Sequence, residues 1–138
     1  MTESPAFLDT NILLRYFLRD YPDQWPRCVS LMEEIARGER SVLVSETVVF
    51  ETVFVLEKRR QVPRPEIASA LLSFIELSSV VLSGKHVVRD AFALYVEHPG
   101  LSFADCYHVI FALKHGITQI FTFDKRIGRI PGVQRIEP

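Results

Sequence analysis

Short apolar runs alternate with longer helical patterns along this chain, and that alternation restricts the fold more than any other feature. Proline and glycine separate the segments, for instance at Gly38, Pro63 and Gly116. Short strands joined by segments long enough for a helix require crossover connections, and therefore form a parallel sheet covered by helices. The pattern predicts an α/β fold, a three-layer α/β/α sandwich with a short parallel central sheet.

The expected elements follow from the period of the apolar residues. Strands are predicted at 6–8, 42–44, 80–82, 120–123 and 133–136. Helices are predicted at 10–19, 24–37, 45–60, 65–77, 85–97 and 102–116. We expect Ser45 to cap the third helix and Pro65 to lie in the first turn of the fourth.

Length and composition indicate one folded domain spanning residues 1–138. Of the 138 residues, 48% are hydrophobic and 24% are charged, which is the balance of a globular protein. Cys28 and Cys106 have no metal-type spacing, and no disulfide is expected. The first five residues do not resemble a signal peptide, and no apolar run is long enough to span a membrane. We expect a cytoplasmic protein without a membrane segment.

Two aspartates follow predicted strands, at the edge of a parallel sheet where ligands bind. Asp9 comes directly after the run 6–8, and Asp124 comes directly after the run 120–123. Aspartate after a strand is also a common helix-capping or turn residue. Each aspartate alone therefore has a structural alternative, and their joint placement favours a site.

Glu51 interrupts a helix that is apolar on nearly every side, so we expect this carboxylate to be buried. A lone buried carboxylate costs several kcal/mol unless it binds a cation or pairs with a positive side chain. The alternative to a functional role is a buried ion pair with an arginine.

Asp105 lies three residues after Ser102, at the start of a predicted helix. Read alone, its simplest role is to accept a hydrogen bond from a backbone amide in the first turn. If Asp9, Glu51, Asp105 and Asp124 converge, however, they need a counterion, because two charges about 4 Å apart repel by roughly 4 kcal/mol. Carboxylates without His or Cys favour Mg²⁺ or Mn²⁺, and such a site suits phosphodiester hydrolysis.

These acidic motifs resemble those of the PIN domain, and especially of the VapC-type toxins of toxin–antitoxin pairs. The resemblance covers essentially the whole chain, and it rests on four motifs in order. The motifs are Asp9-Thr10-Asn11, Glu51 within its apolar helix, Ser102-Phe103-Ala104-Asp105 and Thr122-Phe123-Asp124.

The resemblance implies a Mg²⁺- or Mn²⁺-dependent ribonuclease whose acidic residues are Asp9, Glu51, Asp105 and Asp124. It implies that Asp9, Asp105 and Asp124 bind metal, and that Glu51 does so directly or through water. By the same match Asn11 would hold Asp9 in position, and Thr10 or Thr122 would bond a ligand water or phosphate. The family's members usually form homodimers and are blocked by an antitoxin protein.

The net charge of −1 gives no general attraction to RNA, so any binding has to come from local cations. Of the 16 basic residues 12 are arginine, the type suited to paired contacts with phosphate. Arg15 and Arg19 follow Asp9 on the predicted helix, while Lys125 and Arg126 follow Asp124. We predict these four as RNA contacts.

Two other functions stay open at this point. One is a catalytically silent PIN-like module that binds RNA or protein, which the four intact acids disfavour. The other is an aspartyl phosphotransferase with Asp9 as nucleophile. That class expects a second aspartate two residues later, where this chain has Asn11.

Overall fold

The computed structural model describes residues 4–138, which form two compact units, 4–83 and 84–138. Residues 1–3, part of the argument against a signal peptide, lie outside the described residues. No helix of the described chain is long and apolar enough to cross a membrane.

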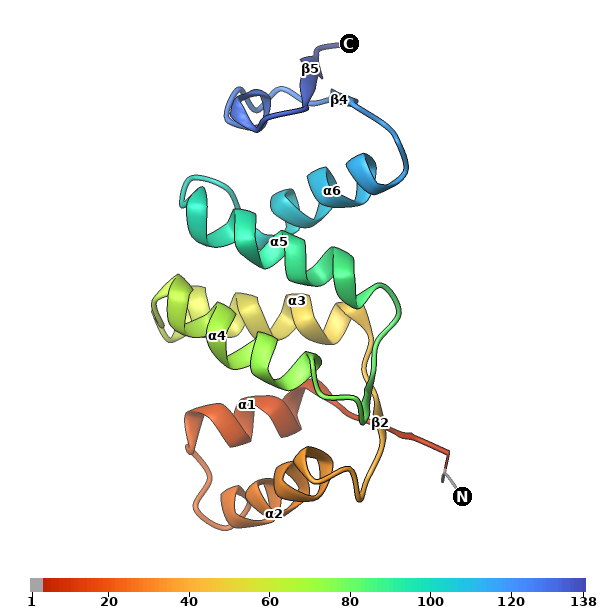
Figure 1. The fold of residues 1–138 in the computed structure, drawn as a ribbon. Helices are drawn as coiled ribbons and strands as arrows, with labels where there is room; N and C mark the ends of the chain where they lie inside the picture. Colours follow the sequence, from red (N-terminus) through yellow and green to blue (C-terminus); the bar gives the residue numbers. More distant parts are fainter. Residues whose placement is uncertain (1–3) are drawn as a thin grey trace. The chain divides into compact units, whose positions relative to one another are not determined.

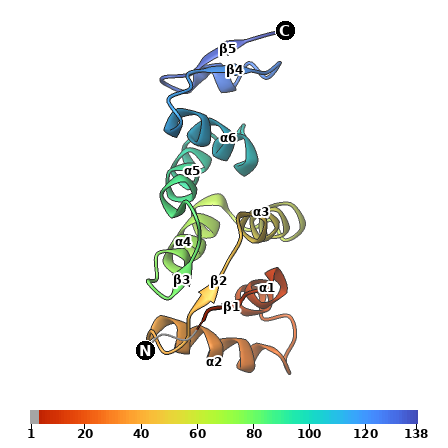
Figure 2. The same cartoon turned by 90° about the vertical axis from the view of Figure 1, so that its right-hand side faces the viewer.

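The first unit contains a parallel sheet of three short strands in the order β1–β2–β3; β2 is labelled in Figure 1 and all three strands are labelled in Figure 2. The strands are β1 (Ala6–Phe7), β2 (Val42–Leu43) and β3 (Val80–Val81). The helices between them are α1 (Thr10–Leu18), α2 (Trp25–Ala36), α3 (Glu46–Phe54) and α4 (Arg64–Ile75). Helix α1 packs against both α2 and α3, as Figure 2 shows from a second side. The predicted parallel pairing is therefore confirmed within this unit.

Branched aliphatic side chains fill the core of the first unit. Leu13, Ile35, Val49, Ile67 and Leu71 are each at most 1% exposed, and they come from all four helices. Burial of such a side chain stabilises the fold by about 1.5–3 kcal/mol, which fixes the helices around the sheet. This packing holds the ends of β1 and α3 in place.

A π-helical turn, Val55–Arg59, continues helix α3. The Arg60 N–H donates to the Val55 carbonyl at 3.1 Å, which is an i to i+5 bond. The predicted helix 45–60 is thus present, with Ser45 as its cap, but its last turn is wider than an α-helix. Such turns are rare and are often found at functional sites.

The second unit contains α5 (Lys85–Glu97), α6 (Phe103–Lys114) and a parallel pair of strands, β4 (Gln119–Phe121) and β5 (Gln134–Ile136). Helices α5 and α6 lie side by side (Figure 1), and aromatic side chains pack between them. The ring centres of Phe92 and Phe103 are 4.4 Å apart, and those of Tyr95 and Phe103 are 5.7 Å apart. This cluster anchors the start of α6, where Asp105 lies.

Most predicted elements are present with boundaries shifted by one or two residues. Strand β4 ends at Phe121, so Asp124 does not follow the strand directly as predicted. The Thr122 N–H still donates to the Ile136 carbonyl at 3.1 Å, which extends the pairing by one residue. Cys28 and Cys106 are buried free thiols, as expected.

Candidate active site

A polar cavity of about 380 Å³ lies in the first unit, beside the N-terminus of α1. Asp9, Thr10 and Asn11 line it from the end of β1 and the start of α1, and Glu51 lines it from α3. The structure therefore brings these four predicted residues together, and the predicted RNA contact Arg15 lines the same cavity. The elements responsible are a strand end and two helices in contact.

Asp9 is exposed and caps helix α1. Its Oδ2 accepts a hydrogen bond from the Asn11 backbone N–H at 3.4 Å, a long bond that leaves most of the carboxylate's capacity unused. The preceding residue is fixed, because the Leu8 N–H donates to the Leu43 carbonyl at 2.9 Å. Asp9 therefore combines the capping alternative with a carboxylate available to a ligand. The contact from Asn11 is made by its backbone.

The prediction that Glu51 is buried is wrong. Glu51 is exposed, and the buried face of α3 consists of Val48, Val49, Thr52 and Val53. The apolar pattern misled because Phe54 is also 55% exposed, so apolar residues of α3 do not all mark its core face. Glu51 accepts a hydrogen bond from Thr10 Oγ1 at 3.3 Å, and its carboxylate faces the cavity rather than an arginine.

Residues that sequence reasoning missed, Asp20, Tyr21, Arg59 and Arg60, line the rest of this cavity together with the predicted RNA contact Arg15. Asp20 Oδ2 lies 3.0 Å from an Arg60 guanidinium nitrogen and 3.7 Å from one of Arg15. The Arg15 guanidinium in turn lies 3.8 Å from the centre of the Tyr21 ring. Arg59, on the π-helical turn, completes the wall. The run Lys58-Arg59-Arg60 is the signal for Arg59 and Arg60 in the sequence, although cations in the last turn of a helix are also favoured by the helix dipole.

Asp105 lies in the second unit and forms a capping box with Ser102 at the start of α6. The Asp105 N–H donates to Ser102 Oγ at 3.0 Å, and Asp105 Oδ2 accepts from the Ser102 N–H at 3.1 Å. The capping alternative is therefore realised. One oxygen of the carboxylate is used in the cap, and the residue is only half-buried.

Asp124 also lies in the second unit, where it pairs with Arg126. Two guanidinium nitrogens of Arg126 each lie 3.0 Å from a different carboxylate oxygen, and the Arg126 N–H donates to Oδ1 at 2.9 Å. These hydrogen bonds lower the pKa of Asp124. Thr122 supports the turn, since its Oγ1 accepts from the Asp124 N–H at 3.0 Å. The carboxylate is ionised at neutral pH and already faces a cation.

The charge of Asp105 also acts on Arg126. Its raised pKa comes mainly from the hydrogen bonds and charge of Asp124, with a smaller contribution from the charge of Asp105. The charges of both carboxylates therefore act on the same guanidinium. In neither unit do the described residues gather three Asp, Glu, His or Cys side chains in positions to hold a metal ion.

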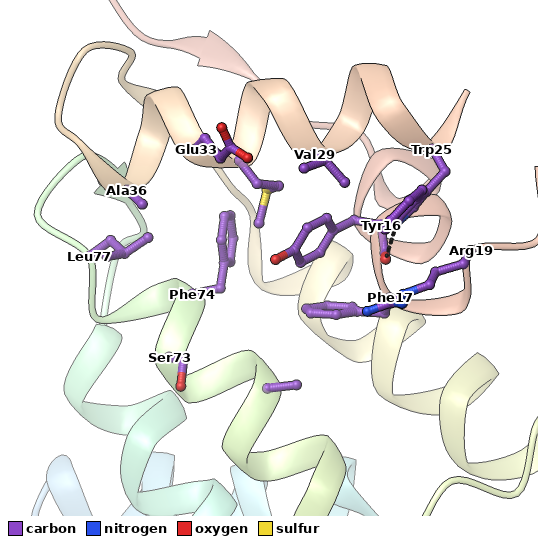
Figure 3. A pocket seen from close by; sticks show the side chains of 12 residues that line it. Tyr16, Phe17, Arg19, Trp25, Val29, Glu33, Ala36, Ser73, Phe74 and Leu77 are labelled. Carbon is purple, nitrogen blue, oxygen red and sulfur yellow. Dashed lines mark hydrogen bonds between the residues drawn. The ribbon is translucent and has the colours of Figure 1, made fainter. Parts of the chain in front are cut away.

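Arg19 does not line the polar cavity. It follows the last residue of α1 with a left-handed φ of 55°, and its guanidinium is 4.9 Å from the Trp25 ring centre. Both side chains line a separate apolar cavity of about 630 Å³ between α1, α2 and α4 (Figure 3). Trp25 is fixed there by its Nε1–H, which donates to the Tyr16 carbonyl at 3.2 Å (Figure 3). Lys125 is exposed in the second unit.

Comparison with known proteins assigns the family. A model of the PIN domain matches residues 6–133, so the chain belongs to the PIN domain family. The match runs through both units and confirms the predicted fold class.

Relatives of similar length carry related names. A protein of Aquifex aeolicus named VapC ribonuclease is 29% identical over 133 residues, which are 95% of each chain. VapC ribonuclease Mb1869c of Mycobacterium bovis and Ribonuclease VapC13 of Mycobacterium tuberculosis are each 25% identical over 132 residues. Those matches cover 94% of this chain and 97% of each relative.

Proposed function

We propose that this protein is an endoribonuclease, the toxin of a toxin–antitoxin pair. The observation that carries the proposal is the similarity, over 94–95% of the chain, to relatives named as VapC ribonucleases. The exposed carboxylates Asp9 and Glu51 on one polar cavity support it, because hydrolysis needs charged groups that substrate can reach. The proposal treats residues 1–138 as a single PIN domain that acts in the cytoplasm.

The proposed metal ligands are Asp9, Asp105 and Asp124, with Glu51 acting directly or through water. These donors are all carboxylate oxygens, and neither free cysteine adjoins the polar cavity, so their chemistry fits Mg²⁺ or Mn²⁺. The bound cation would supply charge neutralisation at the phosphate and a more acidic water. The exposure of Asp9 and the long bond at its Oδ2 are consistent with this role.

The neighbouring residues would hold these carboxylates in place. Thr10 Oγ1 donates to Glu51 and fixes its direction toward the cavity. The Asn11 N–H does the same for Asp9, and the Thr122 hydroxyl shapes the turn that carries Asp124. These three are positioning residues in the proposal.

RNA would be bound by local cations, for which we propose Arg15, Arg19, Lys125 and Arg126. Arg126 has a second effect in this scheme. Its guanidinium occupies both oxygens of Asp124, so a metal ion would have to compete with it for that carboxylate. The proposed partners besides RNA are a cognate antitoxin protein and a second copy of the chain.

The test is RNA cleavage by the purified protein and by four variants, Asp9→Asn, Glu51→Gln, Asp105→Asn and Asp124→Asn. We expect cleavage by the wild type with Mg²⁺ or Mn²⁺ and a large loss in each variant. RNA binding without cleavage would instead support the silent PIN-like module. A phosphorylated Asp9 would support the phosphotransferase, and either result would contradict the proposal.

A further inference from the structure

The polar cavity of the first unit is lined by two chemically different sets of residues. Asp9 and Glu51 supply carboxylates, while Arg15, Arg59 and Tyr21 supply cations and an aromatic ring. The carboxylates suit the metal-assisted chemistry proposed above. That chemistry does not account for the cations and the ring.

The aromatic ring of Tyr21 offers an exposed flat face. It is 45% exposed, and the Arg15 guanidinium lies 3.8 Å from its ring centre, within the range of a cation–π contact. Arg15 is itself held by Asp20 at 3.7 Å, so one side of the ring is supported. An exposed ring stacked on an arginine is the kind of surface on which an unpaired nucleobase stacks.

The backbone holds Tyr21 in this position independently of its side chain. The Tyr21 carbonyl accepts hydrogen bonds from the Gln24 N–H at 3.0 Å and from the Trp25 N–H at 2.8 Å. A substitution of the ring therefore leaves this turn intact. That property makes the residue suitable for a test.

Two residues with an unusual backbone conformation directly adjoin, in sequence, residues that line the cavity. Among residues 4–138, the non-glycine residues with a left-handed φ are Arg19 and Gln61, both at 55°. Arg19 directly precedes Asp20, and Gln61 directly follows Arg60. Asp20 and Arg60 form the ion pair at 3.0 Å. Such conformations cost free energy and concentrate at functional sites. The π-helical turn that carries Arg59 ends directly before Arg60.

Arg59 supplies a cation for a phosphate. It is exposed, lines the cavity and makes no ion pair or hydrogen bond with another side chain of the described residues. Arg60, by contrast, is engaged with Asp20. The cavity volume of about 380 Å³ falls in the range of sites that hold small ligands such as a nucleotide.

The geometry points to a nucleotide subsite in which an unpaired base stacks on Tyr21 and Arg59 binds the adjoining phosphate. The ligand class is single-stranded nucleic acid, and Arg15 acts as a positioning residue that supports the ring. This inference rests on the proposed ribonuclease function. It adds that the enzyme selects an unstacked nucleotide beside Asp9, so base-paired RNA is excluded at this position.

The experiment measures binding rather than cleavage. A ten-nucleotide 2′-O-methyl RNA with one 2-aminopurine is titrated with the Asp9→Asn protein, and both anisotropy and fluorescence quenching are recorded. We expect quenching by Asp9→Asn and by its Tyr21→Phe derivative. Adding Tyr21→Leu should abolish quenching and weaken binding about tenfold, as expected for the loss of one base–aromatic stack. Adding Arg59→Gln should keep quenching and lower the salt slope of binding by about one.

Matched controls are Phe54→Leu, which removes an exposed ring outside the cavity, and Arg27→Gln, which removes an exposed cation outside it. Neither should change quenching. Unchanged affinity and quenching in Tyr21→Leu would overturn the subsite, as would equal binding of a fully paired duplex. Quenching that depends on Tyr21 in a protein that cuts no RNA would support the subsite while the proposed hydrolysis fails. Cleavage of RNA with no effect of Tyr21→Leu would support the proposed hydrolysis and overturn the subsite.

Discussion

At the scale of single residues, Asp9 has two roles that one substitution can separate. Asparagine caps a helix as well as aspartate does, but it lacks the charge that a metal ion needs. Asp9→Asn should therefore change the free energy of unfolding by less than about 1 kcal/mol. A residue that only supports a metal ligand typically contributes about 10–100-fold to activity. The loss of RNA cleavage in Asp9→Asn should be larger than this.

Denaturant unfolding and cleavage rates on the same preparations check this prediction. Asp9→Ala serves as the control, because it removes both the cap and the charge. It should lose about 1 kcal/mol of stability in addition to the activity. Full activity in Asp9→Asn would show that Asp9 is a cap and nothing more.

The Asp124–Arg126 pair makes a prediction about pH. Because hydrogen bonds from Arg126 lower the pKa of Asp124, the pair stabilises the fold above the ordinary carboxyl pKa. That stabilisation is lost as the pH falls through the lowered value. In metal-free protein, NMR titration of the Asp124 carboxyl carbon should give a midpoint below the usual range for aspartate.

Arg126→Ala should raise the Asp124 midpoint toward the ordinary value, and Arg129→Ala should raise it less, since Arg129 acts only through its charge. An unchanged midpoint in Arg126→Ala would contradict the pairing.

Residue chemistry could be predicted further than residue surroundings. The capping roles of Asp9, Ser45 and Asp105 follow from local sequence, and the structure contains all three. The exposure of Glu51 could not be read from its apolar neighbours, because burial depends on which face of α3 meets α1. Nor could the Asp20–Arg60 pair be predicted, since 40 residues separate its members.

At the scale of elements, helix α6 offers a test of whether Asp105 is more than a cap. Asp105→Asn keeps an oxygen that can accept from the Ser102 N–H, so the helix should lose little stability. Ser102→Ala removes the hydroxyl that accepts from the Asp105 N–H, and it should lower the free energy of unfolding by about 1 kcal/mol. If Asp105 binds metal, Asp105→Asn should be the less active of the two, although it is the more stable.

Thermal unfolding and RNA cleavage of both variants, side by side, give the answer. Loss of activity that follows loss of stability in the two proteins would leave Asp105 with a capping role alone.

Element types were predictable and element details were not. The period of apolar residues identified all six α-helices and all five strands of the described chain within a few residues. The π-helical turn at Val55–Arg59 was not predictable, because its sequence continues an ordinary helical pattern. The turn contacts α4, and such contacts exist only in the folded chain.

At the scale of the whole molecule, net charge is a poor guide to function. The net charge of the chain is −1, yet acidic and arginine side chains gather along the same polar cavity. The proposed homodimer belongs to this scale as well. Light scattering after gel filtration should give about twice the chain mass of 15.8 kDa, and a mass of one chain at all concentrations would contradict it.

The central claim is that the carboxylates of this PIN domain hydrolyse RNA with a divalent cation. The most direct measurement is cleavage of a defined RNA by purified protein with Mg²⁺, then with excess EDTA, then with Mg²⁺ restored, with the new ends analysed. We predict cleavage that stops with EDTA and returns with Mg²⁺, and products with a 5′-phosphate and a 3′-hydroxyl. Cleavage that continues in EDTA, or that persists in Asp9→Asn, would contradict the account.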